Sequence, residues 1–197
     1  VVAHYLGVPV EDRALFDRWT EAIVQAAASG DPRAAGNPFG ELLGYFAGLV
    51  ARRRAEPGDD IVSDLVRLGE DDVSTARILG FAFTMVTGGN DTITGMLSGS
   101  ACLLTEHPDQ RAKLIANPRL IPNAVEELLR LTSPVQNLAR TATRDVELHG
   151  VKIPAGKKVL LGYAAANRDR REFGPTAEDL DVERTIAKIL TLSYGTH

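Results

Sequence analysis

A proline-free stretch from about Asp72 to Glu106 constrains the fold of this chain more than any other feature. At about 1.5 Å of rise per residue, a helix over this stretch would be roughly 50 Å long and could span a whole domain. Its middle, residues 78–86, is apolar on nearly every side, which predicts a helix that runs through the core. The sequence therefore predicts a mainly helical protein built around this one helix.

Two glycines and a carboxylate interrupt the apolar middle of this helix, in the run Gly88-Gly89-Asn90-Asp91-Thr92. Each glycine costs about 1 kcal/mol relative to alanine, and a carboxylate is poorly solvated in such surroundings. Thr92 follows Gly88 by four residues, so its hydroxyl can bond the Gly88 carbonyl and open the helix locally.

The interruption has two interpretations that these five residues leave equally open. The bare backbone of Gly88 and Gly89 would let a flat ligand approach, and Asp91 with Thr92 would then supply protons to it. Alternatively, the run is a bend in a core helix, and Asp91 faces a solvent channel or pairs with an arginine.

The remaining segments predict further helices, then a small sheet. Apolar residues recur at helical spacing before Ser29 and again over residues 42–50, and shorter helices are predicted at 61–68, 109–116 and 122–132. A hairpin turns at His149-Gly150, and a strand covers 159–163. We therefore expect one α+β domain over residues 1–197, mainly α with a small β-sheet. Its helical part covers about 1–132, and its β-rich and irregular part about 133–197.

Composition and charge exclude several classes of function. The net charge of -4 and the lack of a sustained basic face argue against a nucleic-acid partner. The longest apolar stretch, residues 78–89, is too short to cross a membrane. The one cysteine, Cys102, allows no intrachain disulfide, so we expect a cytoplasmic protein in which Cys102 is a small buried apolar residue.

Because the chain starts as if inside a helix and stops at His197 without a cap, we expect an internal piece of a longer protein.

Glu127 and Arg130 stand three residues apart on one face of the predicted helix 122–132 and are close enough for a salt bridge. Glu126 offers Arg130 a second partner four residues away. Surface pairs of this kind are common and contribute little to stability, so the spacing alone favours an ordinary surface salt bridge without a functional role.

Several stretches together resemble the cytochrome P-450 family of haem-thiolate monooxygenases, particularly its soluble bacterial members. The run from Gly88 to Thr92 is similar to the motif of the family's central helix, and Glu127-Leu128-Leu129-Arg130 is similar to its Glu-x-x-Arg motif. Further similar stretches are Leu6-Gly7-Val8-Pro9 with Asp12, Phe16 and Trp19; Leu138-Ala139-Arg140; Ala166-Asn167-Arg168-Asp169 with Phe173; and Leu180-Asp181-Val182-Glu183-Arg184. The order and spacing match along essentially the whole chain.

The resemblance implies a role for each matching residue. Asp91 and Thr92 would deliver protons during oxygen activation, and Gly88 and Gly89 would face the haem. Arg140 and His197 would contact haem propionates, for which a guanidinium is well suited. Arg184 would join Glu127 and Arg130 in a structural triad.

The last residues, Leu192-Ser193-Tyr194-Gly195-Thr196-His197, resemble the start of the haem-binding loop, with Leu192 and Ser193 in place of Phe and Gly. The chain stops before the cysteine that binds the iron, so no metal ligand is expected within it. The implied fold is a cytochrome P-450 domain incomplete at both ends. The implied cofactor of the complete protein is haem b. The implied partners are dioxygen, an apolar small-molecule substrate and an electron-transfer protein such as a ferredoxin with its reductase.

Two other interpretations compete with this one. In the first, the chain is a helical terpenoid cyclase in which Asp59, Asp60 and Asp64 hold magnesium. It fails at the second metal motif, where Ser98 stands in place of a carboxylate, and Asp59 with Asp60 is better explained as a turn and helix cap. In the second, the chain is a truncated remnant or helical fragment that catalyses nothing.

Overall fold

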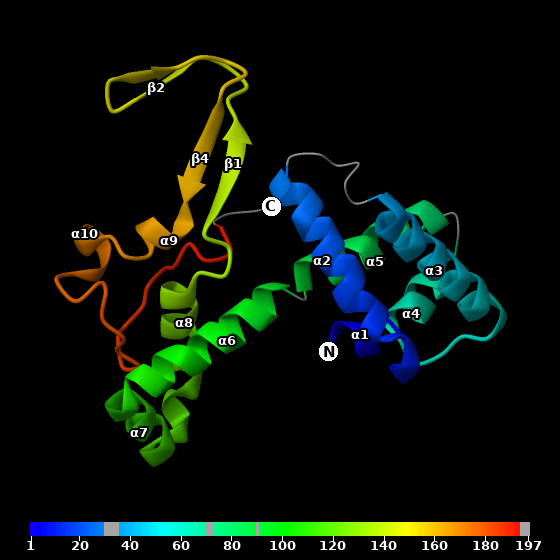
Figure 1. Cartoon of the computed structure of the whole chain (residues 1–197), viewed down its shortest axis with the longest axis horizontal. Coiled ribbons are helices and arrows are strands. Elements are labelled where there is room, and N and C mark those ends of the chain that lie inside the picture. Colours follow the sequence, from blue (N-terminus) through cyan, green and yellow to red (C-terminus); the bar gives the residue numbers. More distant parts are fainter. Residues whose placement is uncertain (30–35, 70–72, 90, 194–197) are drawn as a thin grey trace. The chain divides into compact units, whose positions relative to one another are not determined.

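The structure is a computed structural model that describes residues 1–29, 36–69, 73–89 and 91–193 (Figure 1). It contains two compact units, an N-terminal unit Val1–Asp91 and a C-terminal unit Thr92–His197. Whether the two form the single domain that the sequence predicts stays a prediction. Among the helices of the described residues, none has both the length and the apolar character that a membrane crossing requires.

The N-terminal unit is built from helices, as its sequence predicts. They are α1 (Val2–Tyr5), a 3-10 turn (Val10–Asp12), α2 (Ala14–Ser29), α3 (Gly36–Ala55), α4 (Ile61–Arg67) and α5 (Thr75–Gly89). Its core contains Trp19, Leu42 and Phe46, which are almost completely buried. The stripe of apolar residues at helical spacing explains why α2 and α3 pack against each other.

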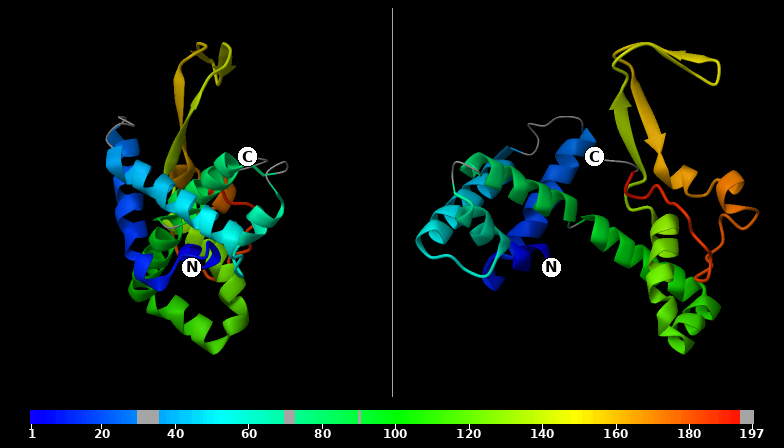
Figure 2. Two further views of the ribbon diagram at one scale, coloured as in Figure 1. Left: turned by 90° about the vertical axis from the view of Figure 1, so that its right-hand side faces the viewer. Right: turned by 180° about the vertical axis from the view of Figure 1, so that it is seen from behind.

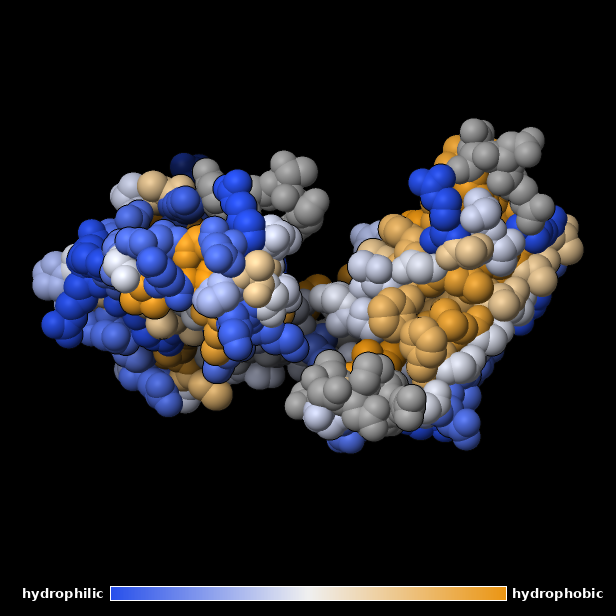
Figure 3. Space-filling view, turned by 90° about the horizontal axis from the view of Figure 1, so that it is seen from above, coloured by the Kyte–Doolittle hydropathy of each residue, from blue (hydrophilic) through white to orange (hydrophobic). Residues whose placement is uncertain are grey.

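Helix α5 buries one face instead of lying in the core on all sides. Ile78, Ala82 and Val86 are four residues apart and fully buried, where α5 packs against α2 and α3. Phe81, on another face, is 37% exposed. The expectation that residues 78–86 run through the core is therefore wrong for this unit, because its other helices cover only one side of α5. The space-filling view shows apolar side chains gathered on this unit, at the right of the picture (Figure 3).

Asp60 begins α4 and holds three parts of the N-terminal unit together. Its carboxylate accepts from the Ser63 amide at 2.8 Å and from Arg53 Nε at 2.7 Å. Arg53 also donates to the Gly7 carbonyl, and a Cβ at Gly7 would lie 2.2 Å from Asp60 Oδ2. Asp60 is thus a helix cap, as the sequence favours, and the described residues contain no group of acids that could hold magnesium.

The C-terminal unit combines helices with two small sheets. The helices are α6 (Asp91–Glu106), α7 (Pro108–Ala116), α8 (Ile121–Thr132), α9 (Tyr163–Ala166) and α10 (Arg170–Phe173), with a 3-10 turn at Pro118–Leu120. Asn90 lies outside the described residues, so the continuity of the predicted helix 72–106 is not tested. The strands are β1 (Asn137–Thr141), β2 (Val146–Leu148), β3 (Val151–Ile153) and β4 (Lys158–Gly162).

The strands form two antiparallel pairs. The pair β2–β3 is the predicted hairpin, with Leu148 opposite Val151 across the His149-Gly150 turn. The pair β1–β4, with Arg140 opposite Val159, includes a strand that the sequence did not predict. In both views of Figure 2, β1 and β4 run side by side and project from the end of the unit that carries α8 and α9.

Helix α6 approaches the end of α8 closely because it carries two glycines on the contact face. A Cβ at Gly99 would lie 2.8 Å from Thr132 Cγ2, and one at Gly95 would lie 3.3 Å from Pro134 Cβ. Ser100, on another face of α6, is also buried. Cys102 of α6 is exposed, which corrects the expectation that this thiol is buried.

Candidate functional site

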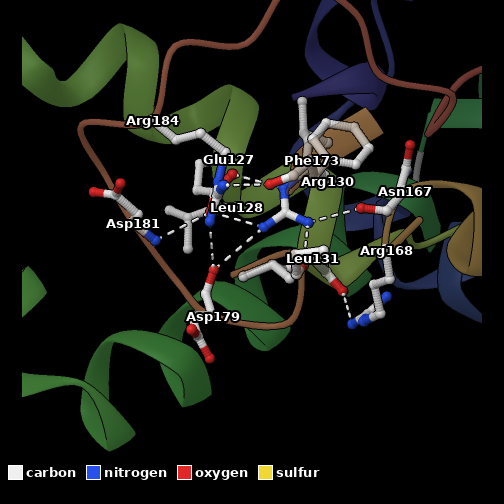
Figure 4. A network of polar contacts seen from close by, with 12 residues as sticks. Glu127, Leu128, Arg130, Leu131, Asn167, Arg168, Phe173, Asp179, Asp181 and Arg184 are labelled. Atoms are coloured by element: carbon white, nitrogen blue, oxygen red, sulfur yellow. Dashed lines mark hydrogen bonds and ion pairs between the residues drawn. The ribbon is translucent and has the colours of Figure 1, made fainter. Parts of the chain in front are cut away.

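The buried centre of the C-terminal unit is an ion pair within helix α8. Glu127 and Arg130 have no exposed side-chain surface, and their contact is bidentate: Arg130 Nε donates to Glu127 Oε2 at 2.7 Å and Nη2 donates to Oε1 at 2.9 Å (Figure 4). Both side chains lie on the face that also buries Ala124, Leu128 and Leu131. The i, i+3 spacing brings them together, and burial on the core face of α8 makes the loss of either partner costly, because the other charge would stay buried without an opposite charge.

The other N–H groups of Arg130 donate hydrogen bonds to main-chain carbonyls of the irregular segment that follows α9. Its Nη1 donates to the carbonyls of Asn167 at 2.7 Å and Ala177 at 2.6 Å, and Nη2 reaches the Asp179 carbonyl at 3.3 Å (Figure 4). Its guanidinium carbon lies 4.8 Å from the centre of the Phe173 ring. One arginine therefore fixes the path of a segment that has almost no regular secondary structure.

Arg184 is the third member of the group. Its Nε donates to Glu127 Oε1 at 3.1 Å, and the same oxygen accepts the Asp181 amide at 3.0 Å. Its other nitrogens donate to the carbonyls of Phe173 at 3.1 Å and Thr176 at 2.8 Å. The structure thus brings together Glu127, Arg130 and Arg184, the three residues that the resemblance placed in one triad. Glu126, the alternative partner of Arg130, is exposed.

Electrostatics keeps Glu127 ionised in this buried position. Burial raises the pKa of Glu127, but hydrogen bonds from Arg130 and the Asp181 amide, the charge of Arg130 and the hydrogen bond from Arg184 outweigh it. The net result is a pKa below the ordinary value of 4.5. A carboxylate surrounded by donors in this way supports structure, because both of its oxygens accept hydrogen bonds that join α8 to the 179–184 segment.

Asn167 is a buried polar centre that sequence reasoning did not single out. Its side chain and those of Ser133 and Thr191 have no exposed surface and are joined by hydrogen bonds. The only signal in the sequence was the similarity of the stretch from Ala166 to Asp169 to a familiar family stretch, which carries no information about these partners.

The predicted acid and alcohol lie at the end of one unit and the start of the other. Asp91 is exposed and Thr92 is half-buried, so the dry surroundings expected for Asp91 are not found among the described residues. The predicted bond from Thr92 to the Gly88 carbonyl crosses Asn90, which lies outside the described residues, and it stays a prediction.

The two glycines of the motif differ in their surroundings. A Cβ at Gly88 would meet nothing within 4 Å, whereas one at Gly89 would lie 2.7 Å from Val2 Cγ2. Gly88 therefore leaves open space beside the backbone of α5. Gly89 instead permits close packing of α1 within the N-terminal unit.

Arg140 projects from β1 and is exposed. Its guanidinium donates to the Ala139 carbonyl at 3.1 Å, and the described part of the chain gives it no carboxylate partner. Most of its donors are thus available for an anionic group. His197, the other predicted propionate contact, lies outside the described residues.

Sequence comparisons match this chain to cytochromes P450. The family model for Cytochrome P450 matches residues 111–185, which include the whole Glu127–Arg130–Arg184 group. Cytochrome P450 130 of Mycobacterium tuberculosis is 57% identical over 202 residues, covering 100% of this chain and 50% of that protein. The Vitamin D(3) 25-hydroxylase of Pseudonocardia autotrophica is 37% identical over 201 residues, covering 100% of this chain and 49% of that protein.

Solved structures give the same result. The cytochrome P450 PksS of the bacillaene polyketide synthase of Bacillus subtilis 168 matches with a TM-score of 0.88 and 32% identity, covering 98% of this chain and 50% of that one. P450BioI, solved with an acyl carrier protein ligated to hexadec-9Z-enoic acid, matches with a TM-score of 0.87 and 32% identity, covering 100% and 52%. The chain spans about half the length of the relatives it matches.

Proposed function

Because the chain belongs to the cytochrome P450 family, we propose that the complete protein is a haem-dependent monooxygenase that inserts one oxygen atom into an apolar organic substrate. The observation that carries this proposal is the 57% identity to a cytochrome P450 along the whole of this chain. The buried Glu127–Arg130–Arg184 group supports it, because it lies inside the stretch that the family model matches.

Two residues, each considered within its own unit, have surroundings that would suit a haem b cofactor. The open space beside Gly88 suits the approach of a flat ring, and the uncommitted donors of Arg140 suit a carboxylate such as a propionate. When bound, haem with a thiolate ligand supplies the activation of dioxygen by electrons from a redox partner. The thiolate would come from outside this chain, since Cys102, its one cysteine, is exposed on α6. For the isolated chain we therefore propose no catalysis.

Asp91 and Thr92 supply the proton chemistry in this proposal. Asp91 accepts protons from solvent, for which its exposure is suitable, and the hydroxyl of Thr92 passes them toward the reacting centre. The short side chain of threonine can act as both donor and acceptor, which a relay requires. Both residues have this role by resemblance to the family's central-helix motif.

The substrate is proposed only as a class. The printed names of relatives include a Vitamin D(3) 25-hydroxylase and a 6-deoxyerythronolide B hydroxylase, and one solved relative holds a fatty acyl chain on a carrier protein. These molecules share a large apolar surface. The electron donor is proposed as a ferredoxin with its reductase, as in bacterial members of the family.

The test uses the full-length protein, with its thiolate loop, loaded with haem. Thr92→Ala should leave haem reduction intact but divert consumed reductant to peroxide, and Asp91→Asn should slow turnover about a hundredfold with substrate affinity little changed. Thr105→Ala is the matched control, because Thr105 is an exposed residue of α6 whose hydroxyl donates to the Ala101 carbonyl. Unchanged coupling in Thr92→Ala, or normal turnover in Asp91→Asn, would remove that residue from the relay.

A further inference from the structure

We propose that Asn167, together with Ser133 and Thr191, is a positioning group that fixes where the polypeptide enters the haem-binding loop. The inference rests on the proposed function, because it assigns these residues to the thiolate-ligated haem of the complete protein. Its evidence is a closed set of hydrogen bonds among three side chains that have no exposed surface.

The amide of Asn167 uses every one of its polar atoms on two segments. Nδ2 donates to Ser133 Oγ at 3.0 Å and to Thr191 Oγ1 at 2.8 Å, and Oδ1 accepts the Leu190 amide at 2.8 Å. An asparagine Nδ2 has two protons, and both are used here. The side chain therefore links the end of α8, through Ser133, to two successive residues of the 190–193 segment.

The directions of these bonds are fixed by the two hydroxyls. Ser133 Oγ donates its single proton to the Arg130 carbonyl at 2.8 Å, and Thr191 Oγ1 donates to the Leu129 carbonyl at 2.8 Å. Each hydroxyl can then only accept from Asn167, so the amide nitrogen must face them. A carboxylate in its place would point an oxygen at two oxygens whose protons are already committed.

The group is also joined to the buried ion pair and to an unusual backbone conformation. Arg130 Nη1 donates to the main-chain carbonyl of Asn167 at 2.7 Å. Ser133, which ends α8, has φ 37° and ψ 66°, a left-handed conformation that residues other than glycine rarely adopt. A buried serine is held there by its bonds to Arg130 and Asn167, which indicates that the surrounding network determines the position closely.

The 190–193 segment is thus attached at three places where the loop is expected to begin. Leu190 and Thr191 bind Asn167, and Ser193 Oγ accepts from the Tyr163 hydroxyl at 3.3 Å. Leu192 and Ser193 are the first residues of the stretch, Leu192 to His197, that resembles the start of the haem-binding loop. A glycine-containing loop has little conformational preference of its own, so its starting point must be set by the residues before it.

The test is the ligation state of the haem in the full-length holoprotein, measured from the Soret band of the reduced carbon-monoxide complex. Thr191→Val removes the hydroxyl without changing the shape of the side chain. It should raise the ratio of the form without thiolate to the thiolate form about tenfold, equivalent to ~1.4 kcal/mol. Thr191→Ser, which keeps the hydroxyl, should restore the wild-type ratio.

Thr20→Val is the matched control. Thr20 is also buried and donates one hydrogen bond, to the Phe16 carbonyl at 2.8 Å, but it belongs to the N-terminal unit. It should lower the thermal stability and leave the carbon-monoxide spectrum unchanged. A purely structural role for Thr191 would make the two variants alike, so equal spectra in Thr191→Val and Thr20→Val would overturn the proposal.

Tyr163→Phe is a second variant for the case in which Thr191→Val does not fold. It removes one longer bond to the same segment and should raise the ratio above that of Thr20→Val, by less than about tenfold. A ratio equal to that of Thr20→Val would count against the proposal. If the wild-type protein itself lacks the thiolate-type band, the proposed function fails, which is a separate result.

Discussion

Glu127 is a single carboxylate that serves two guanidinium groups in the C-terminal unit. It accepts from Arg130 and Arg184 and also from the Asp181 amide. Removing its charge leaves Arg130 fully buried without an opposite charge, and a buried charge without a partner is strongly destabilising. Glu127 should therefore contribute far more to stability than the short Glu-x-x-Arg motif suggests.

We expect Glu127→Gln to lower the free energy of unfolding of the C-terminal unit by about 3–5 kcal/mol, measured by urea denaturation and far-UV circular dichroism. Glu126→Gln is the matched control, because Glu126 is the exposed neighbour on the same helix and should change stability by less than about 0.5 kcal/mol. Equal effects of the two substitutions would show that the buried Glu127 contributes no more to stability than the exposed Glu126.

The depressed pKa of Glu127 predicts a dependence of stability on pH. Below the ordinary value of 4.5 the unfolded chain binds a proton that the folded chain does not. This contribution is fully present above that pH and is lost as pH falls through the lower pKa of the folded state. Acid titrations followed by circular dichroism should show a steeper loss of stability below about pH 4.5 for wild type and Glu126→Gln than for Glu127→Gln.

At the scale of elements, the contact of α6 with the end of α8 depends on the absence of a side chain at Gly99. The methyl of a β-branched threonine, Thr132, occupies the space, and its χ1 angle has few alternatives. We expect Gly99→Ala to destabilise the C-terminal unit by about 1–3 kcal/mol through overpacking, measured by chemical denaturation.

Two companion variants make this prediction specific. Gly44→Ala, at an exposed site of α3 where a Cβ meets nothing within 4 Å, should stabilise the N-terminal unit by about 0.5–1 kcal/mol. Thr132→Ala should recover much of the loss when combined with Gly99→Ala. If the double variant is as unstable as the sum of the single ones, the close contact is not the cause.

The helices could be predicted from the sequence because they leave a periodic pattern. The stripe of α8 and its Pro122 near the start gave helix 122–132, and the structure has Ile121–Thr132. Strand β1 was missed because all five of its residues are exposed and show no buried and exposed alternation.

The site could be predicted only in part. Spacing placed Glu127 beside Arg130, but the same spacing describes a surface pair, so burial could not be inferred from it. The partners of Arg130 at 167, 177 and 179 are main-chain carbonyls, which every residue type provides. They leave no trace in the sequence. The role of Asn167 could not be predicted for a different reason: its side-chain partners Ser133 and Thr191 lie 34 and 24 residues away along the chain.

At the scale of the whole molecule, each compact unit has its own hydrophobic core. One core includes Trp19, Leu42 and Phe46, and the other includes Leu128 and Val182. Trp19 is the one tryptophan of the chain and is only 2% exposed, so its fluorescence reports on the N-terminal unit. Circular dichroism reports on both units.

We expect the two units to respond separately to substitution in the 197-residue chain. Glu127→Gln should lower the denaturation midpoint seen by circular dichroism and leave the midpoint of Trp19 fluorescence unchanged. Leu42→Ala, which removes a fully buried side chain, should shift the fluorescence midpoint by the equivalent of about 2–5 kcal/mol. Coincident shifts of both probes in both variants would instead show one cooperative transition.

The two arginines hold the segment between α9 and Arg184 almost entirely by its carbonyl oxygens. Hydrogen bonds to main-chain carbonyls do not depend on which side chains the bonded residues carry. An exposed position there, such as Pro175, can accept wide randomisation in a combinatorial library while the chain keeps its course. The segment is consequently a place where surface properties could be redesigned without rebuilding the interior.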